Sequence, residues 1–389
     1  MILQLLQYID LILYAYMLIS VGYVFIFAIA SHIQIEKKHS ISMATNLKRF
    51  VILIPAYKED KVILDSVLSV LKQNYPSTLY DVVVISDKMK AETNTTLRDA
   101  GAEVLTIHFK ESSKAKALNF ASEYLKEHSY DYILILDADN IIPNTYLQDI
   151  NTIMVSTGYK VLQTHRKAKN LNSEIAILDA IIEEMNNSIF RQGHVNLGFS
   201  SALIGSGMIF DYHWFLSNIK NISSTGEDKE FEELLLRQQM HIHYTSHIVV
   251  WDEKVQKKEV LQYQRRRWIA TQFYLAKLMW PHIFKALQNK NGDYLLKTLQ
   301  TFIFPRSILL GILGLICIII SFISLTLSVK WWIILILYLV ALYMAIPASM
   351  RNKQLYKVIR NIPYFIYIMI LNLFHLKGAE KKFIHTEHG

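Results

Sequence analysis

The chain has 389 residues, enough for about two domains, and 52% of them are hydrophobic while only 19% are charged. Its formal net charge is +8, but many basic residues adjoin apolar runs, so the excess does not indicate a nucleic-acid partner and we expect none. The single cysteine, Cys317, lies within an apolar run, which excludes a disulfide framework and a thiolate zinc site.

The apolar residues gather in Leu5–Ala30 and Thr301–Leu376, on either side of a middle region with the mixed composition of a soluble domain. Leu11–Ala30 is an uncharged run long enough to cross ~30 Å of hydrocarbon as a helix. Ala28-Ile29-Ala30 resembles a signal-peptidase site, but the run is too long for a secretory signal and no basic residues precede it. We therefore expect an uncleaved anchor over residues 1–32. Basic residues follow the anchor, which predicts a middle domain on the cytoplasmic side of the plasma (inner) membrane.

The middle region alternates buried strands with helical patterns. Strands are expected at Phe50–Pro55, Asp81–Asp87 and Glu103–Ile107, followed by a helix over Ser112–Glu127. This order predicts right-handed βαβ units and a Rossmann-like, mostly parallel α/β sheet. Glycine is absent from residues 50–100, so no phosphate-binding glycine loop is present there, and an anion must be held by a metal ion and cationic side chains.

Two aspartates follow the strand that contains Ile133-Leu134-Ile135-Leu136. Ligands of open α/β sheets bind outside the carboxyl ends of the strands, so Asp137 and Asp139 stand where a site is expected. Their carboxylates can converge on one hard divalent cation. The alternative is that they begin a polar loop.

A series of motifs runs in order over roughly residues 48–275. The motifs are Pro55-Ala56-Tyr57-Lys58-Glu59, Asp87, Lys114-x-x-Ala117-Leu118-Asn119, Asp137-x-Asp139, Gly205-Ser206-Gly207, Glu227-Asp228 and Gln264-x-x-Arg267-Trp268. This set resembles the motifs of family 2 glycosyltransferases. It is most similar to those of the membrane-embedded cellulose, hyaluronan and chitooligosaccharide synthases, and ceramide glucosyltransferases carry a similar one.

The resemblance implies a GT-A domain over residues 45–260, between N- and C-terminal transmembrane helices. It implies that Asp139, with Asp137 beside it, binds Mg2+ or Mn2+, which neutralises the diphosphate of a UDP-sugar.

The same resemblance implies that Tyr57, Glu59 and Asp87 hold the uridine and that Lys114 lies near the nucleotide. The alternatives are a strand-terminating role for Asp87 and a solvated helix lysine for Lys114.

The resemblance also implies that Asp228 is the general base that takes the proton of the acceptor hydroxyl. Single displacement with one base inverts an α-linked donor and gives a β-glycoside. Glu227 is the weaker candidate, and both acids also suit the start of a helix electrostatically.

Acceptor contacts are expected at the glycine-rich turn containing Ser206 and Gly207, although an ordinary tight turn is the alternative. Gln264 and Trp268 are also expected in the acceptor site, where the Trp268 ring offers a flat face to a sugar. Arg267 can bind phosphate oxygens, or it belongs to an ordinary positive-inside cluster. These residues lie in interfacial helices over residues 261–300.

Two further segments have ordinary structural interpretations. Ser173–Arg191 is expected to be an amphipathic helix that packs on the core. His241, His243 and His247 are interpreted as strand histidines, because no fourth zinc ligand is evident.

The C-terminal membrane region, residues 301–376, is expected to contain spans at Thr301–Val329 and Trp331–Ser349. Ile362–Leu376 is short and flanked by basic residues, which favours a re-entrant or interfacial helix over a third crossing. Residues 377–389 are expected to form a cytoplasmic tail that folds back near the site, as the resemblance implies.

The predicted function is an inverting β-glycosyltransferase that moves a hexose or N-acetylhexosamine from a UDP-sugar to a growing polysaccharide. The alternatives are a single transfer to a lipid acceptor, and a non-catalytic nucleotide-sugar-binding subunit of an export assembly. Membrane lipids are expected around the spans. Because so few spans cannot form a wide polymer pore in one chain, an export partner or a homo-oligomer is compatible with the sequence.

Overall fold

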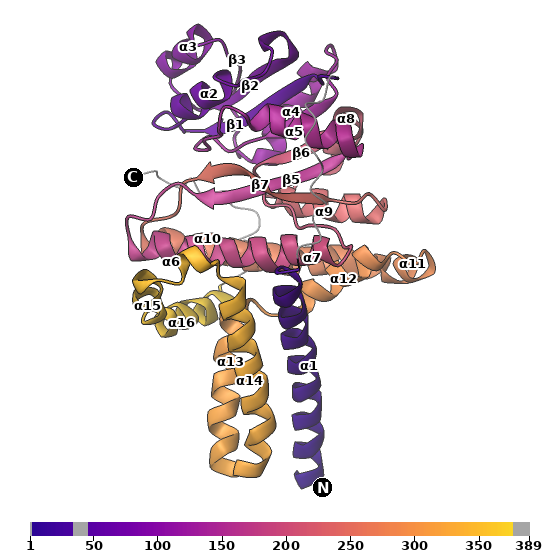
Figure 1. Ribbon diagram of the computed structural model, residues 1–389, viewed down its shortest axis with the longest axis vertical. Coiled ribbons are helices and arrows are strands. Elements are labelled where there is room, and N and C mark those ends of the chain that lie inside the picture. Colours follow the sequence, from indigo (N-terminus) through magenta and orange to yellow (C-terminus); the bar gives the residue numbers. More distant parts are fainter. Residues whose placement is uncertain (1, 34–45, 376–389) are drawn as a thin grey trace.

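The structure is a computed structural model that describes residues 2–33 and 46–375. The elements form three tiers, namely an α/β domain, a layer of helices beneath it and a group of long helices that projects from that layer (Figure 1). The N-terminal helix and two helices of the C-terminal region, within residues 306–345, form the projecting group, so the α/β domain is inserted between membrane segments.

One seven-stranded sheet, in the order β3-β2-β1-β4-β6-β5-β7, forms the centre of the α/β domain. Strand β1 pairs in parallel with β2 and β4, whereas β6 runs antiparallel to β4 and β5. The predicted mostly parallel sheet is therefore confirmed. Its strands are β1 (Phe50–Tyr57), β2 (Tyr80–Asp87), β3 (Glu103–Ile107), β4 (Tyr132–Ile135), β5 (Val161–Ala168), β6 (Met208–Asp211) and β7 (His243–Asp252).

Helices cover both faces of the sheet, which explains why the central strands are apolar throughout. One hydrophobic core lies under α2 (Ile63–Leu71), α3 (Ala91–Asp99) and α5 (Tyr146–Thr157). The other lies under α4 (Lys114–Leu125), α8 (Tyr212–Asn218) and α9 (Glu227–Arg237).

The middle tier joins the sheet to the membrane segments (Figure 1). The expected helix from Ser173 is present as α6 (Glu174–Asn186), after which Asn187–Gln192 forms a π-helix. The rest of the tier is α7 (Gly193–Asn196), α10 (Lys258–Met279), α11 (Ile283–Gln288) and α12 (Gly292–Phe302). Gly193 is required here, because a Cβ at this position would overlap the carbonyl oxygen of Phe27 in the N-terminal helix.

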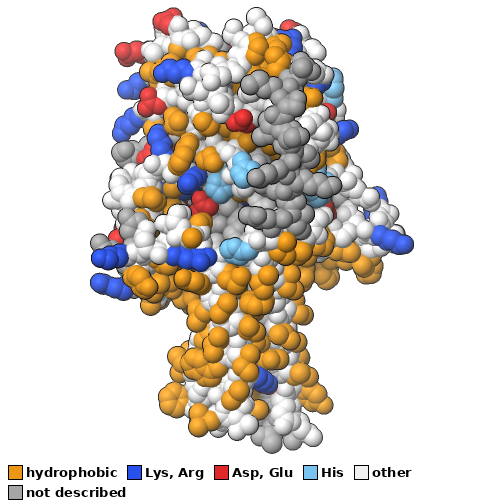
Figure 2. All heavy atoms as spheres, viewed as in Figure 1, with side chains coloured by type: hydrophobic (Ala, Val, Ile, Leu, Met, Phe, Trp, Pro, Cys, Tyr) orange, Lys and Arg blue, Asp and Glu red, His pale blue; other side chains and the backbone are white. Residues whose placement is uncertain are grey.

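In the part of the chain that the structure describes, three helices are long and apolar enough to span a membrane, namely α1 (Ile2–Ala30), α13 (Arg306–Ile323) and α14 (Leu325–Ala345). Hydrophobic side chains dominate the visible surface of this tier (Figure 2). The C-terminal spans differ from the expected limits because Pro305 separates α12 from α13 and because only Ser324 separates α13 from α14.

The last described helices are α15 (Lys353–Ile359) and α16 (Ile362–Leu373). Helix α16 has 12 residues, or roughly 18 Å at ~1.5 Å per residue, which is too short to cross ~30 Å of hydrocarbon. It packs against α10 and α13, where Asn372 Oδ1 accepts a hydrogen bond from Arg266 Nε at 3.2 Å. This position favours the interfacial alternative. The predicted tail lies outside the described residues.

Candidate functional site

A cavity of about 800 Å³ lies at the carboxyl ends of β1, β2 and β4 and continues downward between α6, α10 and the membrane helices. Ligand sites of open α/β sheets are expected at this edge. Ten of the predicted site residues line the cavity: Tyr57, Glu59, Asp87, Lys114, Asp137, Asp139, Asp228, Gln264, Arg267 and Trp268.

The residues predicted to hold a nucleotide come from the ends of β1 and β2. Tyr57 and Asp87 are the last residues of these paired strands and lie side by side in register. The Asp87 side chain is buried, and its Oδ1 has no hydrogen-bond partner among the described residues. Lys58 and Lys88 each place an ammonium group 5.4 Å from the centre of the Tyr57 ring. This corner therefore combines an orphaned carboxylate oxygen, an aromatic face and two cations.

Lys114, the first residue of α4, lines the cavity and contacts three other segments of its wall. The Ser113 side chain caps the helix by accepting from the Lys116 N–H, which fixes the start of α4. Lys114 Nζ donates to Asp137 Oδ1 at 2.5 Å and to the Gly205 carbonyl at 2.6 Å, and it lies 3.6 Å from Glu227 Oε1.

Burial disfavours the charged form of Lys114, but the pKa of its ammonium is nevertheless raised because Asp137 and Glu227 outweigh that effect. The solvated-lysine alternative is therefore wrong.

Asp137 and Asp139 occupy the turn after β4. Asn140 organises this turn, since its Oδ1 accepts from the Asp137 N–H at 2.9 Å and its Nδ2 donates to Asp139 Oδ1 at 3.1 Å. Asp139 Oδ2 accepts from the Glu253 N–H at 3.1 Å, which ties the turn to the end of β7.

Among the residues that the structure describes, no three His, Cys, Asp or Glu side chains are grouped to hold a metal ion. A pair of carboxylates nevertheless fits Mg2+ or Mn2+, because such ions are commonly bound by one or two carboxylates together with phosphate oxygens and water.

The two acids at the start of α9 have different surroundings. Gly226 precedes them, and a Cβ there would lie 2.5 Å from Thr271 Cγ2, so the glycine allows α9 to begin directly against α10. Asp228 faces the cavity with 20% of its side chain exposed, and its Oδ2 lies 3.7 Å from Lys229 Nζ. Glu227 is buried, and this burial, with Asp228 and Asp137 nearby, raises its pKa to about 7 although Lys114 opposes the shift.

Ser206 and Gly207 do not line the cavity, contrary to the prediction that they contact an acceptor. The Ser206 hydroxyl is fully buried and donates to Asn140 Oδ1. Gly207 donates its N–H to the Ile135 carbonyl at 2.9 Å and has a φ of +63°, in the left-handed region that favours glycine. These two residues start β6 beside β4, and it is the preceding Gly205 that faces the cavity.

The α10 motif forms the opposite wall, with Gln264, Arg267 and Trp268 on the cavity surface. Arg265, which the sequence did not single out, is buried and forms an ion pair with Asp179 of α6. Its guanidinium lies 4.1 Å from the centre of the Trp268 ring, a distance typical of a cation–π contact. Arg265 thus fixes the Trp268 ring against the middle tier.

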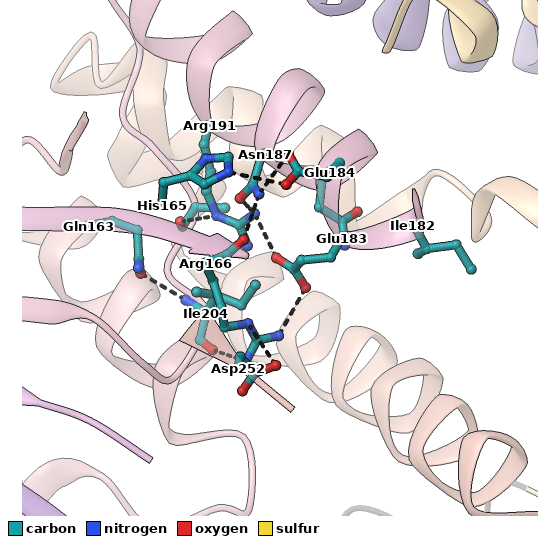
Figure 3. A network of polar contacts seen from close by, with 12 residues as sticks. Gln163, His165, Arg166, Ile182, Glu183, Glu184, Asn187, Arg191, Ile204 and Asp252 are labelled. Atoms are coloured by element: carbon teal, nitrogen blue, oxygen red, sulfur yellow. Dashed lines mark hydrogen bonds and ion pairs between the residues drawn. The ribbon is translucent and has the colours of Figure 1, made fainter. Parts of the chain in front are cut away.

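A buried ion-pair network beneath the sheet was also missed (Figure 3). Arg166 Nη2 donates to Glu183 Oε2 at 2.9 Å, and Arg166 Nε lies 3.7 Å from Asp252 Oδ2. Glu183 Oε1 also accepts a hydrogen bond at 3.2 Å from Nη1 of Arg191, which lies in the π-helix that follows α6. Burial alone would raise the pKa of Glu183, but the two arginines hold it well below its usual value.

The sequence offered one signal for this network. No role was predicted for Asp179 and Glu183, which are four residues apart in α6 and therefore share one helix face. In the structure it is buried against β5 and α10, where Arg166 and Arg265 neutralise it.

His243 and His247 lie in β7 as predicted, whereas the interpretation of His241 as a strand residue was wrong, because β7 begins only at His243. His241 Nδ1 lies 3.4 Å from Asp293 Oδ2, and the His243 ring stacks on Tyr159.

Comparisons with known proteins bear on this site. A family described as "Glycosyltransferase like family 2" matches residues 48–271, more than half of the chain. The catalytic subunit of a UDP-forming cellulose synthase from Komagataeibacter sucrofermentans is 34% identical over 98 residues, which are 25% of this chain and 13% of that protein. The chain thus spans only a small part of this relative.

Among solved structures, the mannosyltransferase PcManGT from Pyrobaculum calidifontis, in complex with GDP-Man and Mn2+, is similar with a TM-score of 0.53. The similarity covers 86% of this chain and 97% of that one at 13% identity, so the two share a fold.

Proposed function

The chain belongs to glycosyltransferase family 2, and from this premise we propose that it transfers a hexose or N-acetylhexosamine from a UDP-sugar to an acceptor hydroxyl, with inversion to a β-glycoside. The observation that carries the proposal is the convergence of Asp137, Lys114 and Asp228 on one cavity at the carboxyl ends of the strands. A nucleotide-sugar transferase needs a cationic site for the diphosphate and a base for the hydroxyl at one place.

Asp139 and Asp137 would hold Mg2+ or Mn2+, which neutralises the charge that grows on the leaving diphosphate. Lys114 adds a fixed ammonium on the same side and keeps Asp137 in position through the 2.5 Å contact. Arg267 offers a further guanidinium from the opposite wall. The Mn2+ in the similar mannosyltransferase complex supports a divalent ion here as well.

The orphaned Oδ1 of Asp87 supports a role in holding the nucleobase, because a buried carboxylate oxygen without a partner is well placed to accept from a ring N–H. Tyr57 and Glu59 line the same corner of the cavity and complete the proposed uridine site.

On the acceptor side, Asp228 takes the proton of the attacking hydroxyl as its oxygen bonds to the anomeric carbon. Its partial exposure in the cavity supports this role, whereas Glu227 is held against Lys114. Trp268 and Gln264 position the acceptor sugar or head group. Ser206 and Gly207 support the wall from behind.

The enzyme acts at the membrane, with its catalytic domain on the cytoplasmic side of the plasma (inner) membrane. Arg351 and Lys353, which follow the last span, support this orientation under the positive-inside rule. A growing polysaccharide is the acceptor that the sequence favours. A lipid acceptor is the second candidate, and the continuation of the cavity toward α14 and α16 favours it. An export partner or a homo-oligomer would be needed for polymer secretion.

The test is a donor screen with the purified full chain in membranes, comparing UDP-glucose, UDP-N-acetylglucosamine and GDP-mannose with Mg2+ or Mn2+. We expect release of UDP, loss of activity on chelation and a β-linkage by NMR. Activity with GDP-mannose alone, or an α-linked product, would contradict the proposal. Full activity of Asp228→Asn would reject the catalytic assignment, and a wild type that binds UDP without transferring sugar would favour the non-catalytic alternative.

A further inference from the structure

The lower end of the cavity is apolar and is formed by the membrane helices. It lies below the Arg265 and Trp268 wall, on the side away from the sheet. Apolar side chains of α1, α6, α13, α14 and α16 line it, including Val24, Ile182, Leu310, Leu342 and Phe365, together with Ile346, which directly follows α14. A site for a wholly water-soluble acceptor would not need such a lining.

The cavity stops close to one end of the spans. Its deepest lining residues are Tyr23, seven residues before the end of α1 at Ala30, and Leu339, six residues before the end of α14 at Ala345. At ~1.5 Å of helix per residue, Tyr23 and Leu339 lie roughly 9–11 Å from the ends of their helices. The hydrocarbon layer of a membrane is ~30 Å thick. Among the described residues the lining therefore reaches only the nearest third of the membrane. This depth matches the head groups and upper acyl chains of one leaflet, and it is too shallow for a passage through the membrane.

A cation whose charge is met only by an aromatic ring among the described residues lies in this apolar end, where the Arg306 guanidinium is 5.4 Å from the centre of the Phe190 ring. Arg306, the first residue of α13, donates through Nη2 to Asn186 Oδ1 at 2.7 Å and to the Ile182 carbonyl at 3.3 Å. Within the described part of the chain it forms no ion pair, and its Nη1 is buried without a hydrogen-bond partner. Buried guanidinium groups are ordinarily paired, so this one calls for an anion that the described residues do not supply.

Other polar atoms on the same wall are also unsatisfied. The Nε of Arg265, a residue 4% exposed, and the amide oxygens of Gln264 and Gln300 are buried without partners among the described residues. All of these residues line the cavity. Donors for an anion and acceptors for a hydroxyl are thus available between the proposed base and the lipid-facing end.

We propose that the acceptor is a lipid with a phosphate-bearing, hydroxylated head group, which enters from the bilayer with its phosphate on Arg306 and its acyl chains against α14 and α16. This inference rests on the proposed function and selects one of its acceptors. The cationic partner and the apolar lining favour an anionic phospholipid over a neutral lipid or a free phosphate.

The reaction balances without a further reactant. The head-group hydroxyl oxygen forms a bond to the anomeric carbon while the bond from that carbon to the diphosphate oxygen breaks. The hydroxyl proton goes to Asp228, and UDP leaves with the bonding electron pair.

The test uses the full chain in nanodiscs made of phosphatidylcholine alone or of phosphatidylcholine with phosphatidylglycerol. Transfer of label from a UDP-sugar to lipid is measured, and UDP affinity is measured separately. In a third arm, glycerol phosphate is added to the neutral discs. The variants are Arg306→Gln, Arg306→Lys, which keeps the charge, and Arg351→Gln. The last is a matched control, because Arg351 also bonds to backbone carbonyls near the membrane surface but does not line the cavity.

We expect labelled lipid only in the discs with phosphatidylglycerol. Arg306→Gln should lower the rate roughly tenfold or more at unchanged UDP affinity, because a charge-assisted hydrogen bond is lost, while Arg306→Lys retains part of it. Arg351→Gln should behave as the wild type.

Equal labelling in neutral discs, transfer to glycerol phosphate, a water-soluble polymer as product, or full activity of Arg306→Gln would overturn the inference. Loss of UDP affinity in Arg306→Gln would also overturn the inference, because it would indicate a structural role for Arg306. A wild type that neither binds UDP nor transfers sugar would instead reject the proposed function.

Discussion

The ammonium group of Lys114 lies 2.5 Å from Asp137 Oδ1, so α4 and β4 meet through a charge-assisted hydrogen bond on the wall of the cavity. The same ammonium donates to the Gly205 carbonyl and faces Glu227. One side chain therefore joins the proposed metal ligands to the start of α9, where the proposed base stands.

Replacing Lys114 by methionine should weaken UDP binding roughly 10- to 100-fold, because hydrogen bonds to charged groups contribute about 1.5–3 kcal/mol. Isothermal titration of UDP in the presence of Mg2+ or Mn2+ measures the change. Lys116→Met is the matched control, since Lys116 lies on the same helix turn but is exposed and bonds only near Glu111. Equal UDP affinities of the two variants would remove Lys114 from the nucleotide site.

Asp228→Asn should lower kcat by roughly 10²–10⁴-fold while leaving the affinity for UDP largely unchanged, because the variant loses the proton acceptor but keeps the shape of the site. Glu227→Gln should leave more activity, since Glu227 is buried and its pKa of about 7 already favours the neutral form below neutrality. The kcat values of the two variants are compared by steady-state kinetics, with the same series of donor concentrations for both. A larger loss in Glu227→Gln than in Asp228→Asn would exchange their roles.

The strands were predictable because buried parallel strands require continuous apolar runs, and Glu103–Ile107 has the expected limits. The limits of the spans were not predictable, because hydropathy alone does not show that α12 ends at Phe302 or that α13 begins at Arg306, directly after Pro305. Acids at strand ends indicated the site.

The contact of Lys114 with Asp137 and the burial of Ser206 depend instead on how distant segments pack, as does the pairing of Arg166 with Glu183. These interactions join residues between 17 and 66 positions apart, and no local pattern encodes them.

Gly207→Ala should destabilise the protein by roughly 2–4 kcal/mol, because the added Cβ would overlap Thr164 Oγ1 and the backbone is left-handed at φ +63°. Gly198→Ala provides the control for backbone strain alone. Gly198 has a φ of +80° but no atom within 4 Å of the added Cβ, so a cost of about 1 kcal/mol is expected. Thermal unfolding of both variants in the same detergent measures the difference, and equal melting temperatures would show that the contact with Thr164 is easily relieved.

His194 lies in α7, where the N-terminal span meets the middle tier. The ring is buried, its Nε2 lies 2.8 Å from the Tyr23 hydroxyl and its Nδ1 lies 3.2 Å from the Ser200 carbonyl. Burial, with a smaller contribution from Lys297, lowers its pKa to about 3, although the Ser200 carbonyl, Glu232 and Asp293 partly oppose the shift.

The unfolded state therefore binds more protons than the folded state between about pH 3 and 6.5, and stability is lost as the pH falls through this window. At pH 5 the loss from this group is about 2 kcal/mol relative to pH 7.5. Glu227 acts in the opposite sense, because its raised pKa makes the folded state the stronger proton binder between about pH 4.5 and 7. The comparison is therefore made in a Glu227→Gln background. There, the melting temperature should fall between pH 7.5 and pH 5, and His194→Gln should reduce that fall. An undiminished fall in the double variant would mean that other groups, such as His243, account for the acid sensitivity.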